Sequence, residues 1–236
     1  MLFFLLDTLR DSPARLLAVL PVFLLTVVGS LVFGLTVHEF AHALAAHVQG
    51  DDTAKRVGRL SLNPIRHLDP TGTFMILVIG FGWGKPVPVN QNRLSQGPTG
   101  MTLVAAAGPL SNLMLAFLLA IPIKLGLLDY TGLGLYRITT VTNGGLLDGL
   151  SDLVSLIIFF NLLLAVFNLI PLAPLDGSKV VGGLIPRHQA VAYARLERNG
   201  PLILVAIVML DYALGLGILW GIIGPVVNGL KSAAIG

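Results

Sequence analysis

The sequence contains no cysteine among its 236 residues, and only 11% of those residues are charged. Without cysteine, disulfide bonds and thiolate metal sites are excluded, so any transition metal must be held by His, Asp or Glu. A soluble domain carries about 25% charged residues, whereas here 55% of the residues are hydrophobic and the mean hydropathy is +0.85. The composition predicts an all-α polytopic membrane protein and excludes soluble, fibrous and disordered classes.

Positive charge is also scarce and dispersed. The chain has 15 Lys and Arg against 12 Asp and Glu, and the basic residues lie in short loops between apolar runs. This distribution suits a membrane protein and lacks the concentrated basic surface that binds nucleic acid. We therefore expect a lipid bilayer as the environment and no nucleic-acid partner.

Apolar stretches long enough to cross a bilayer, about 20 residues, define the predicted spans. They cover residues 16–37, 94–123, 153–175 and about 201–230. Residues 70–84 are too few to cross, and their glycines weaken a helix, so we expect a re-entrant or β-hairpin element there. The prediction is a single integral membrane domain over residues 1–236, with about four spanning helices plus this short element.

The basic loops predict the orientation, because Lys and Arg accumulate on the cytoplasmic side. They follow the first predicted span, as Lys55, Arg56, Arg59 and Arg66, and the third, as Lys179, Arg187, Arg195 and Arg198. The first and third spans are therefore expected to run inward, with both termini outside, although Arg10 and Arg15 oppose this.

A His-Glu-x-x-His motif, His38-Glu39-x-x-His42, follows directly on the first apolar run. On a helix, residues four apart lie about 40° apart on one face, so both imidazoles point the same way and Glu39 lies beside them. In zinc hydrolases with this motif, the histidines bind the metal and the glutamate is the general base. The motif predicts a zinc site near one end of the first span.

Catalytic zinc typically has three protein ligands and one open position for water, so a third ligand is needed. Asp176 is the candidate, in Asn168-Leu-Ile-Pro171-Leu-Ala-Pro174-Leu-Asp176-Gly177. The two prolines force irregular backbone, which membranes tolerate only inside protein or beside a water-filled cavity. One Zn2+ with Asp176 and Glu39 forms a cluster of zero net charge, which is the kind that can be buried.

These two motifs resemble the site-2 protease family of intramembrane zinc metalloproteases. Further segments resemble its small bacterial and archaeal branch, without PDZ or CBS domains: Gly50-Asp-Asp-Thr-Ala-Lys, Gly58-Arg-Leu-Ser-Leu-Asn63-Pro64, His67-Leu-Asp69-Pro70, Gly84-Lys-Pro-Val-Pro-Val-Asn90 and Ala107-Gly-Pro-Leu-x-Asn112. The resemblance covers about residues 37–183, within a catalytic core of about 16–183.

The resemblance implies an enzyme that cleaves the transmembrane segments of other membrane proteins or peptides, often after a first cut by another protease. His38, His42 and Asp176 would ligate zinc, and Glu39 would activate water. Asn168 would hold the substrate backbone or the developing oxyanion, and Asn112 is a weaker candidate for lining the site. We expect a multi-pass protein of a bacterial or archaeal cell membrane, with the site toward the cytoplasm.

Two other functions use the same residues. A metal-ion transporter or channel would use His38, His42 and Asp176 as a transit site, since ionisable groups within membranes often mark ion paths. A non-catalytic membrane adaptor would bind partners and tolerate loss of the metal. Turnover that depends on Glu39 separates a hydrolase from both.

Other segments leave alternatives open. Residues 84–90 alternate valine with proline, which suits an exposed edge strand that pairs with an unwound substrate, or a plain loop. His67 and Asp69 would bind a second metal or order their loop by hydrogen bonds. Asn168 would instead form a hydrogen bond between spans. Asn161 and Asn168, seven residues apart, share one helix face, so that face is expected to look into the bundle.

Overall fold

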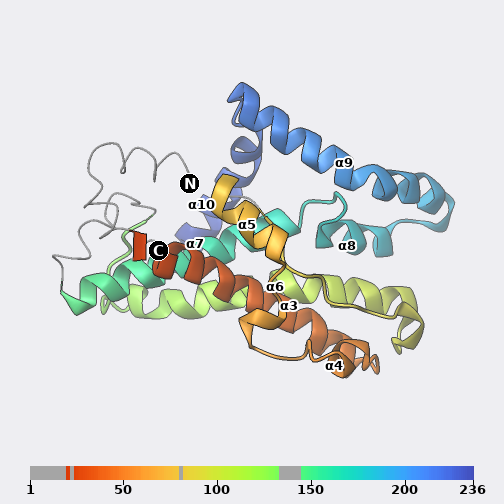
Figure 1. The fold of residues 1–236 in the computed structure, drawn as a ribbon, viewed down its shortest axis with the longest axis horizontal. Helices are drawn as coiled ribbons and strands as arrows, with labels where there is room; N and C mark the ends of the chain where they lie inside the picture. The colour runs from red at the N-terminus through yellow and green to blue at the C-terminus, as the bar shows by residue number, and fades with distance from the viewer. Residues whose placement is uncertain (1–19, 22–23, 80–81, 133–144) are drawn as a thin grey trace.

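The computed structural model describes residues 20–21, 24–79, 82–132 and 145–236, and these form a helical bundle (Figure 1). In chain order the elements are η1 (Leu24–Val28), α3 (Gly29–Val48), α4 (Thr53–Arg56), η2 (Pro64–Arg66), α5 (Pro70–Ile79), η3 (Gln91–Arg93), α6 (Gly97–Lys124), α7 (Leu146–Asn168), α8 (Asp176–Leu184), η5 (Arg187–Gln189), α9 (Ala190–Leu214) and α10 (Ile218–Ile235).

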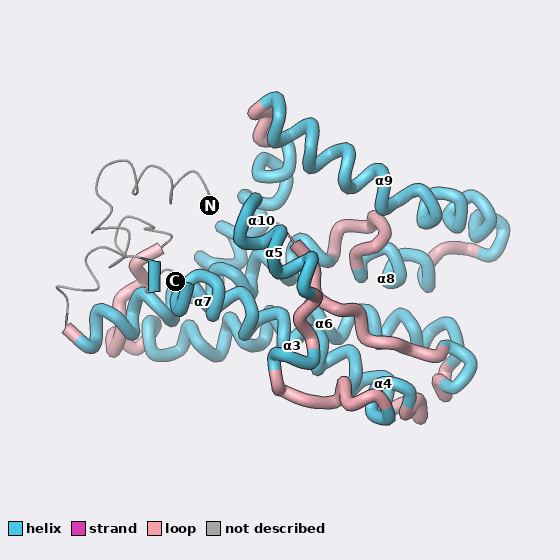
Figure 2. The backbone as a smooth tube through the Cα atoms, in the orientation of Figure 1, coloured by secondary structure: helices cyan, strands magenta, loops and turns pink. Residues whose placement is uncertain are grey.

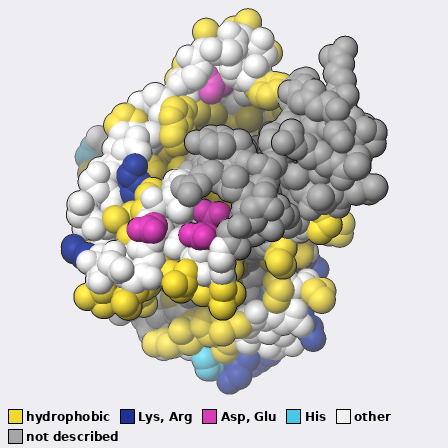
Figure 3. Space-filling view, turned by 90° about the vertical axis from the view of Figure 1, so that its left-hand side faces the viewer, with side chains coloured by type: hydrophobic (Ala, Val, Ile, Leu, Met, Phe, Trp, Pro, Cys, Tyr) yellow, Lys and Arg dark blue, Asp and Glu magenta, His cyan; other side chains and the backbone are white. Residues whose placement is uncertain are grey.

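Four of the described helices are long and apolar enough to cross a membrane: Leu25–Val48, Thr99–Lys124, Leu146–Asn168 and Ile218–Ile235. The predicted all-α membrane fold with about four spans is confirmed. Large apolar side chains are exposed along one face of α6, at Leu110, Met114, Leu118 and Ile121. Figure 3 shows further exposed hydrophobic patches on one face of the molecule, and exposed apolar surface of this kind marks surfaces that contact a membrane or another protein.

The core lies where α6, α7 and α10 meet. Its buried residues are Ala116, Ala120, Ile123, Ile158, Leu162, Ile223, Val227 and Ala234. Alanines on α6 allow close approach of the neighbouring helices, as is usual in membrane bundles. Helix α6 also contacts α3 and α8, so it is the central helix against which the others are placed.

The short element predicted at residues 70–84 consists of a helix followed by a loop that runs back along it. Residues 70–79 form α5, and the chain then comes back along its start, because a Cβ at Gly72 would lie 2.9 Å from Trp83 backbone atoms. The described residues contain one antiparallel bridge, between Leu68 and Gly84, and no β-hairpin. Of the two forms expected, the described residues do not form the β-hairpin; α5 is followed by a loop (Figure 2).

The end of the chain differs from the prediction of one span at about 201–230. The chain forms two helices there, because Gly215 and Gly217 adopt φ angles of +61° and +66° and end α9. Asp211 stabilises the break: its carboxylate accepts from Ile218 N at 2.6 Å and so caps α10. Helix α9 lies at the edge of the molecule, joined to the bundle through α8 and α10 (Figure 1).

The third span also differs from the predicted residues 153–175. Helix α7 begins at Leu146 and ends at Asn168, although its first half carries Asp148 and Asp152. Pro171 lacks an N–H and cannot continue the helix. Residues 169–175 form an irregular turn, as the two prolines predicted, and Asp176 opens the separate helix α8.

Candidate metal centre

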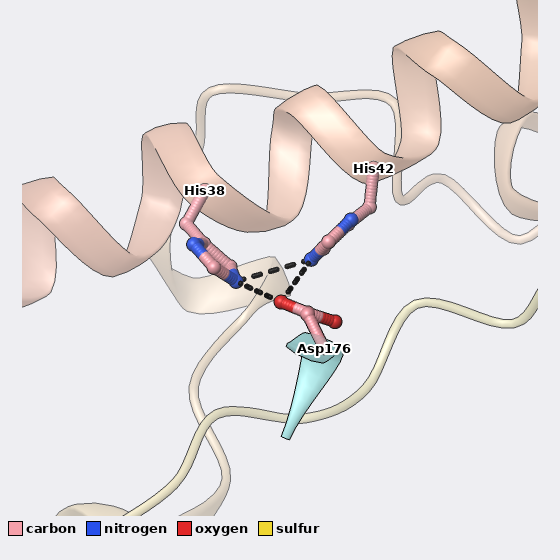
Figure 4. Close-up of side chains that lie close together, drawn as sticks. All are labelled: His38, His42 and Asp176. Carbon is pink, nitrogen blue, oxygen red and sulfur yellow. Dashed lines mark hydrogen bonds and ion pairs between the residues drawn. The ribbon is translucent and has the colours of Figure 1, made fainter. Parts of the chain in front are cut away.

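Helix α3 supplies the three residues of the sequence motif from one buried stretch. The exposed fractions of His38, Glu39 and His42 are 3%, 9% and 7%. Their four-residue spacing places both imidazole rings on the same face, with ring centroids 4.6 Å apart. Figure 4 shows both rings reaching from α3 toward Asp176.

The irregular turn after α7 delivers Asp176. Two of its backbone hydrogen bonds, Leu175 N to Leu172 O at 3.0 Å and Ser178 N to Leu175 O at 3.1 Å, close it into the start of α8. A Cβ at Gly177 would lie 2.5 Å from Ile170 O. The lack of a side chain at Gly177 thus lets α8 start against the end of α7, which brings Asp176 to the histidines.

Three donor atoms converge at one point. His38 Nε2 lies 3.0 Å from Asp176 Oδ2, His42 Nε2 lies 3.1 Å from the same oxygen, and the two nitrogens are 3.0 Å apart. Among the described residues, His38, His42 and Asp176 form a cluster of three side chains that could hold a metal ion. The structure thus joins residues that lie more than 130 positions apart in the chain.

The far sides of both rings are held by α6. His42 Nδ1 lies 2.7 Å from the carbonyl oxygen of Val104, and His38 Nδ1 lies 2.6 Å from Asn112 Oδ1. A carbonyl oxygen can only accept, so His42 Nδ1 carries the proton and its Nε2 presents a lone pair. Gly108, between these two α6 residues, has no Cβ, and one there would lie 2.6 Å from His42 Cε1.

This donor set fits zinc. Ligand atoms of a tetrahedral zinc ion with bonds of about 2.0–2.1 Å lie about 3.3 Å apart, close to the 3.0–3.1 Å found here. An ionised carboxylate oxygen beside a nitrogen lone pair is a repulsive arrangement unless a cation lies between them.

Glu39 faces a cavity of about 360 Å³ next to these donors. Its carboxylate forms no hydrogen bond or ion pair with another described residue. Apolar side chains make up most of the cavity wall, including Val87, Val89 and Leu204 of α9. A carboxylate in apolar surroundings, beside a cation site, is free to exchange a proton with a bound molecule.

The two candidate asparagines lie in different places. Asn168, the last residue of α7, lines the cavity, and its Nδ2 donates to Leu164 O of the same helix at 2.9 Å. Asn112 differs from the expectation: it is fully buried behind His38 and is not among the described residues that line the cavity. Its amide is held between α3 and α7, through Gly34 O and Asn161 Oδ1.

The loop residues His67 and Asp69 order their loop. His67 is fully buried and its Nε2 lies 2.6 Å from Ser61 O, while Asp69 Oδ1 accepts from Gly72 N at 2.8 Å. Neither belongs to a cluster of three metal-ligating side chains in the described part of the chain.

Sequence reasoning missed two groups that contact the site. Nothing in a side-chain pattern marks the carbonyl oxygen of Val104. The sequence places Asn161 on a face that looks into the bundle, but it does not show the hydrogen bond to Asn112. The sequence signal for such a bond is a polar amide within an otherwise apolar span.

Comparisons with known proteins give one peptidase family and relatives named as zinc metalloproteases. The family described as "Peptidase family M50" matches residues 26–210. The "Putative zinc metalloprotease YwhC" of Bacillus subtilis is 40% identical over 194 residues, which cover 82% of this chain and 84% of that protein. The "Putative zinc metalloprotease Rip2" of Mycobacterium tuberculosis is 34% identical over 173 residues, covering 72% of this chain and 60% of that protein. No solved structure matches the chain significantly.

Proposed function

The chain belongs to peptidase family M50, and from this premise we propose that it is an endopeptidase that hydrolyses peptide bonds in or near the transmembrane segments of other membrane proteins. Its zinc metalloprotease relatives and its membrane-length helices make it a membrane zinc metalloprotease. The proposal concerns the residues that carry the reaction, the substrates and the orientation.

One observation carries the proposal. Two imidazole nitrogens and a carboxylate oxygen meet within 3.0–3.1 Å inside a membrane-length helix bundle, with Glu39 at the same cavity. Ionisable groups within a membrane are costly and need a compensating partner. A divalent cation held by His38, His42 and Asp176 supplies that partner, and Glu39 gives the cluster the base that hydrolysis needs.

The chain's own residues perform defined steps. Zinc bound at the three donors would lower the pKa of water to about 7 and polarise a carbonyl group. Glu39 takes the proton of the attacking water and passes it to the leaving amine, because its carboxylate faces the cavity without another partner. Asn168 has an amide N–H beyond the one given to Leu164, and it donates this to the substrate carbonyl oxygen.

The apolar cavity wall supports a hydrophobic, extended substrate. A transmembrane helix hides its peptide carbonyls in its own hydrogen bonds, so the substrate must unwind before it is cut. Residues 85–90 run beside the cavity without helix or strand, and Val87 and Val89 line it. An unwound substrate segment would pair with this edge by strand addition, with helix-breaking residues near the cut site favouring cleavage.

The position of the site along α3 supports the cytoplasmic orientation. His38 and His42 lie in the second half of the span Leu25–Val48, toward the end that leads into Lys55 and Arg56. Basic residues mark the cytoplasmic side, so we place the site near the inner face of a bacterial or archaeal cell membrane. Cleavage there would release a cytoplasmic fragment, as in regulated intramembrane proteolysis.

The proposal is tested by cleavage of a panel of single-span substrates in liposomes, with metal content measured on the same samples. Glu39→Gln should retain zinc and lose about 10²- to 10⁴-fold in rate, the contribution of a general base. Glu197→Gln is the matched control, since Glu197 is the only other glutamate in the sequence. Zinc binding with no cleavage by the wild type, together with zinc flux across the liposomes, would instead support the transport alternative.

A further inference from the structure

The side-chain amide of Asn112 lies directly behind the ligand His38. Both residues are buried, with exposed fractions of 0% and 3%. The three contacts of this amide join three helices: Oδ1 lies 2.6 Å from His38 Nδ1, and Nδ2 lies 3.0 Å from Gly34 O and 2.7 Å from Asn161 Oδ1. Both the oxygen and the nitrogen of the Asn112 amide therefore have hydrogen-bond partners.

These contacts allow only one orientation of the Asn112 amide. Gly34 O is a backbone carbonyl and can only accept, so the group next to it must be the NH₂. In the flipped orientation Oδ1 would lie against this oxygen and against Asn161 Oδ1, which is repulsive in a site without water. Asn161 is oriented in turn, because its Nδ2 donates to Ile157 O at 2.8 Å and thus directs its Oδ1 at Asn112.

The orientation determines the tautomer of His38. Since Asn112 Oδ1 accepts, His38 Nδ1 must carry a proton. This leaves Nε2, which lies beside His42 Nε2 and Asp176 Oδ2, as the ring nitrogen that can bind a metal. The other tautomer would place a proton on the atom that is to bind the metal. His42 reaches the same state through the backbone oxygen of Val104, so His38 is the histidine whose tautomer depends on side chains.

We propose that Asn161 and Asn112 are positioning residues that fix the His38 tautomer and so prepare its Nε2 for metal binding. The relay runs from Ile157 O through Asn161 and Asn112 to His38. Gly34 makes it possible, because a Cβ there would lie 3.2 Å from the Asn161 amide and 3.0 Å from Leu164 Cδ1. The inference rests on the proposed function for the metal site, but its effect is already present in the metal-free protein.

The test measures the His38 tautomer without metal or substrate. Protein labelled with ¹⁵N-histidine is stripped of metal in detergent micelles, and the Nδ1 and Nε2 shifts of His38 are assigned through His38→Gln. The wild type should show a protonated Nδ1. Asn112→Leu removes the acceptor, and Asn161→Leu removes one of the two acceptors that orient the Asn112 amide. Both variants should therefore lower the population of the Nδ1 proton on His38, Asn161→Leu by less.

Zinc affinity, measured by chelator competition, gives the second readout. Loss of an outer hydrogen-bond partner of a metal ligand typically costs about 10- to 100-fold in affinity. We expect a loss in this range for Asn112→Leu and a smaller loss, in the same direction, for Asn161→Leu. Ser155→Ala is the matched control, because it removes a buried hydrogen bond of the same helix, from Thr131 N at 3.0 Å, and should leave the His38 shifts and zinc affinity unchanged.

The outcomes separate this inference from the proposed function. A His38 that keeps a protonated Nδ1 and wild-type zinc affinity in Asn161→Leu overturns the relay, even if the protein cleaves substrates. The expected shift in tautomer supports it even if no substrate is cleaved. If Asn112→Leu does not fold, as judged by thermal unfolding, Asn161→Leu decides alone, since it retains the Asn112 side chain.

Discussion

Substitution of Gly108 tests the geometry of the metal site most directly. Gly108 lies on α6, and a Cβ there would overlap His42 Nε2 and lie 2.6 Å from His42 Cε1 and 2.7 Å from His38 Cε1. Ordinary contacts begin at 3.4 Å, so the His38 ring must move by about 0.7 Å and the His42 ring by about 1.0 Å, several times the roughly 0.2 Å tolerance of a zinc–ligand distance. Gly108→Ala therefore disturbs both histidine ligands at once.

The expected result is a loss of zinc affinity of at least about 100-fold, the upper end of what a lost outer partner costs, because here the ligands themselves move. The assay is chelator competition in detergent, with thermal unfolding of the metal-free protein alongside it. Gly29→Ala is the matched control on α3, where a Cβ has nothing within 4 Å, and it should bind zinc like the wild type. Wild-type zinc affinity in a folded Gly108→Ala protein would refute the proposed ligand geometry.

Two further predictions concern the wall of the cavity and the stability of the fold. Val87→Pro and Val89→Pro remove backbone donors beside the cavity, so cleavage should slow while zinc content stays at the wild-type value; an unchanged rate contradicts strand addition. Burial raises the pKa of Asp51, but hydrogen bonds from Thr53 and Asn90 outweigh this and lower it. The ionised carboxylate thus stabilises the fold above the unfolded-state pKa of about 3.9, and this contribution is lost as the pH falls through the lower folded-state pKa. Asp51→Asn should lower the free energy of unfolding by about 1–3 kcal/mol at pH 7. Chemical unfolding of the wild type and the variant measures this difference, and a difference that stays the same below about pH 3 contradicts the prediction.

Much of the fold could be predicted because a bilayer imposes strong rules on composition and helix length. The errors came from local features that average hydropathy does not register. Gly215 and Gly217 divide the last segment through their left-handed backbone, and Asp211 caps the second half. Helix α7 starts before the predicted span although Asp148 and Asp152 lie in it, since only two charged residues interrupt a long apolar run.

The sequence by itself determined what depends on near neighbours. The spacing of His38 and His42 on one helix decides that their rings share a face, because helix geometry is local. The prolines before Asp176 likewise decide that the backbone there is irregular. These residues and the absence of cysteine were enough to predict the metal and its three candidate ligands.

Only the tertiary structure decided how these residues act together. Asp176 reaches the histidines because α8 packs against α6, and Gly108 and Gly177 leave room for that approach. The protonation of the two imidazoles is decided by Val104 O and by the Asn112 amide, which Gly34 and Asn161 hold in place. These are contacts between distant parts of the chain, and one of them is a backbone oxygen that every residue possesses, so no pattern of side chains encodes it.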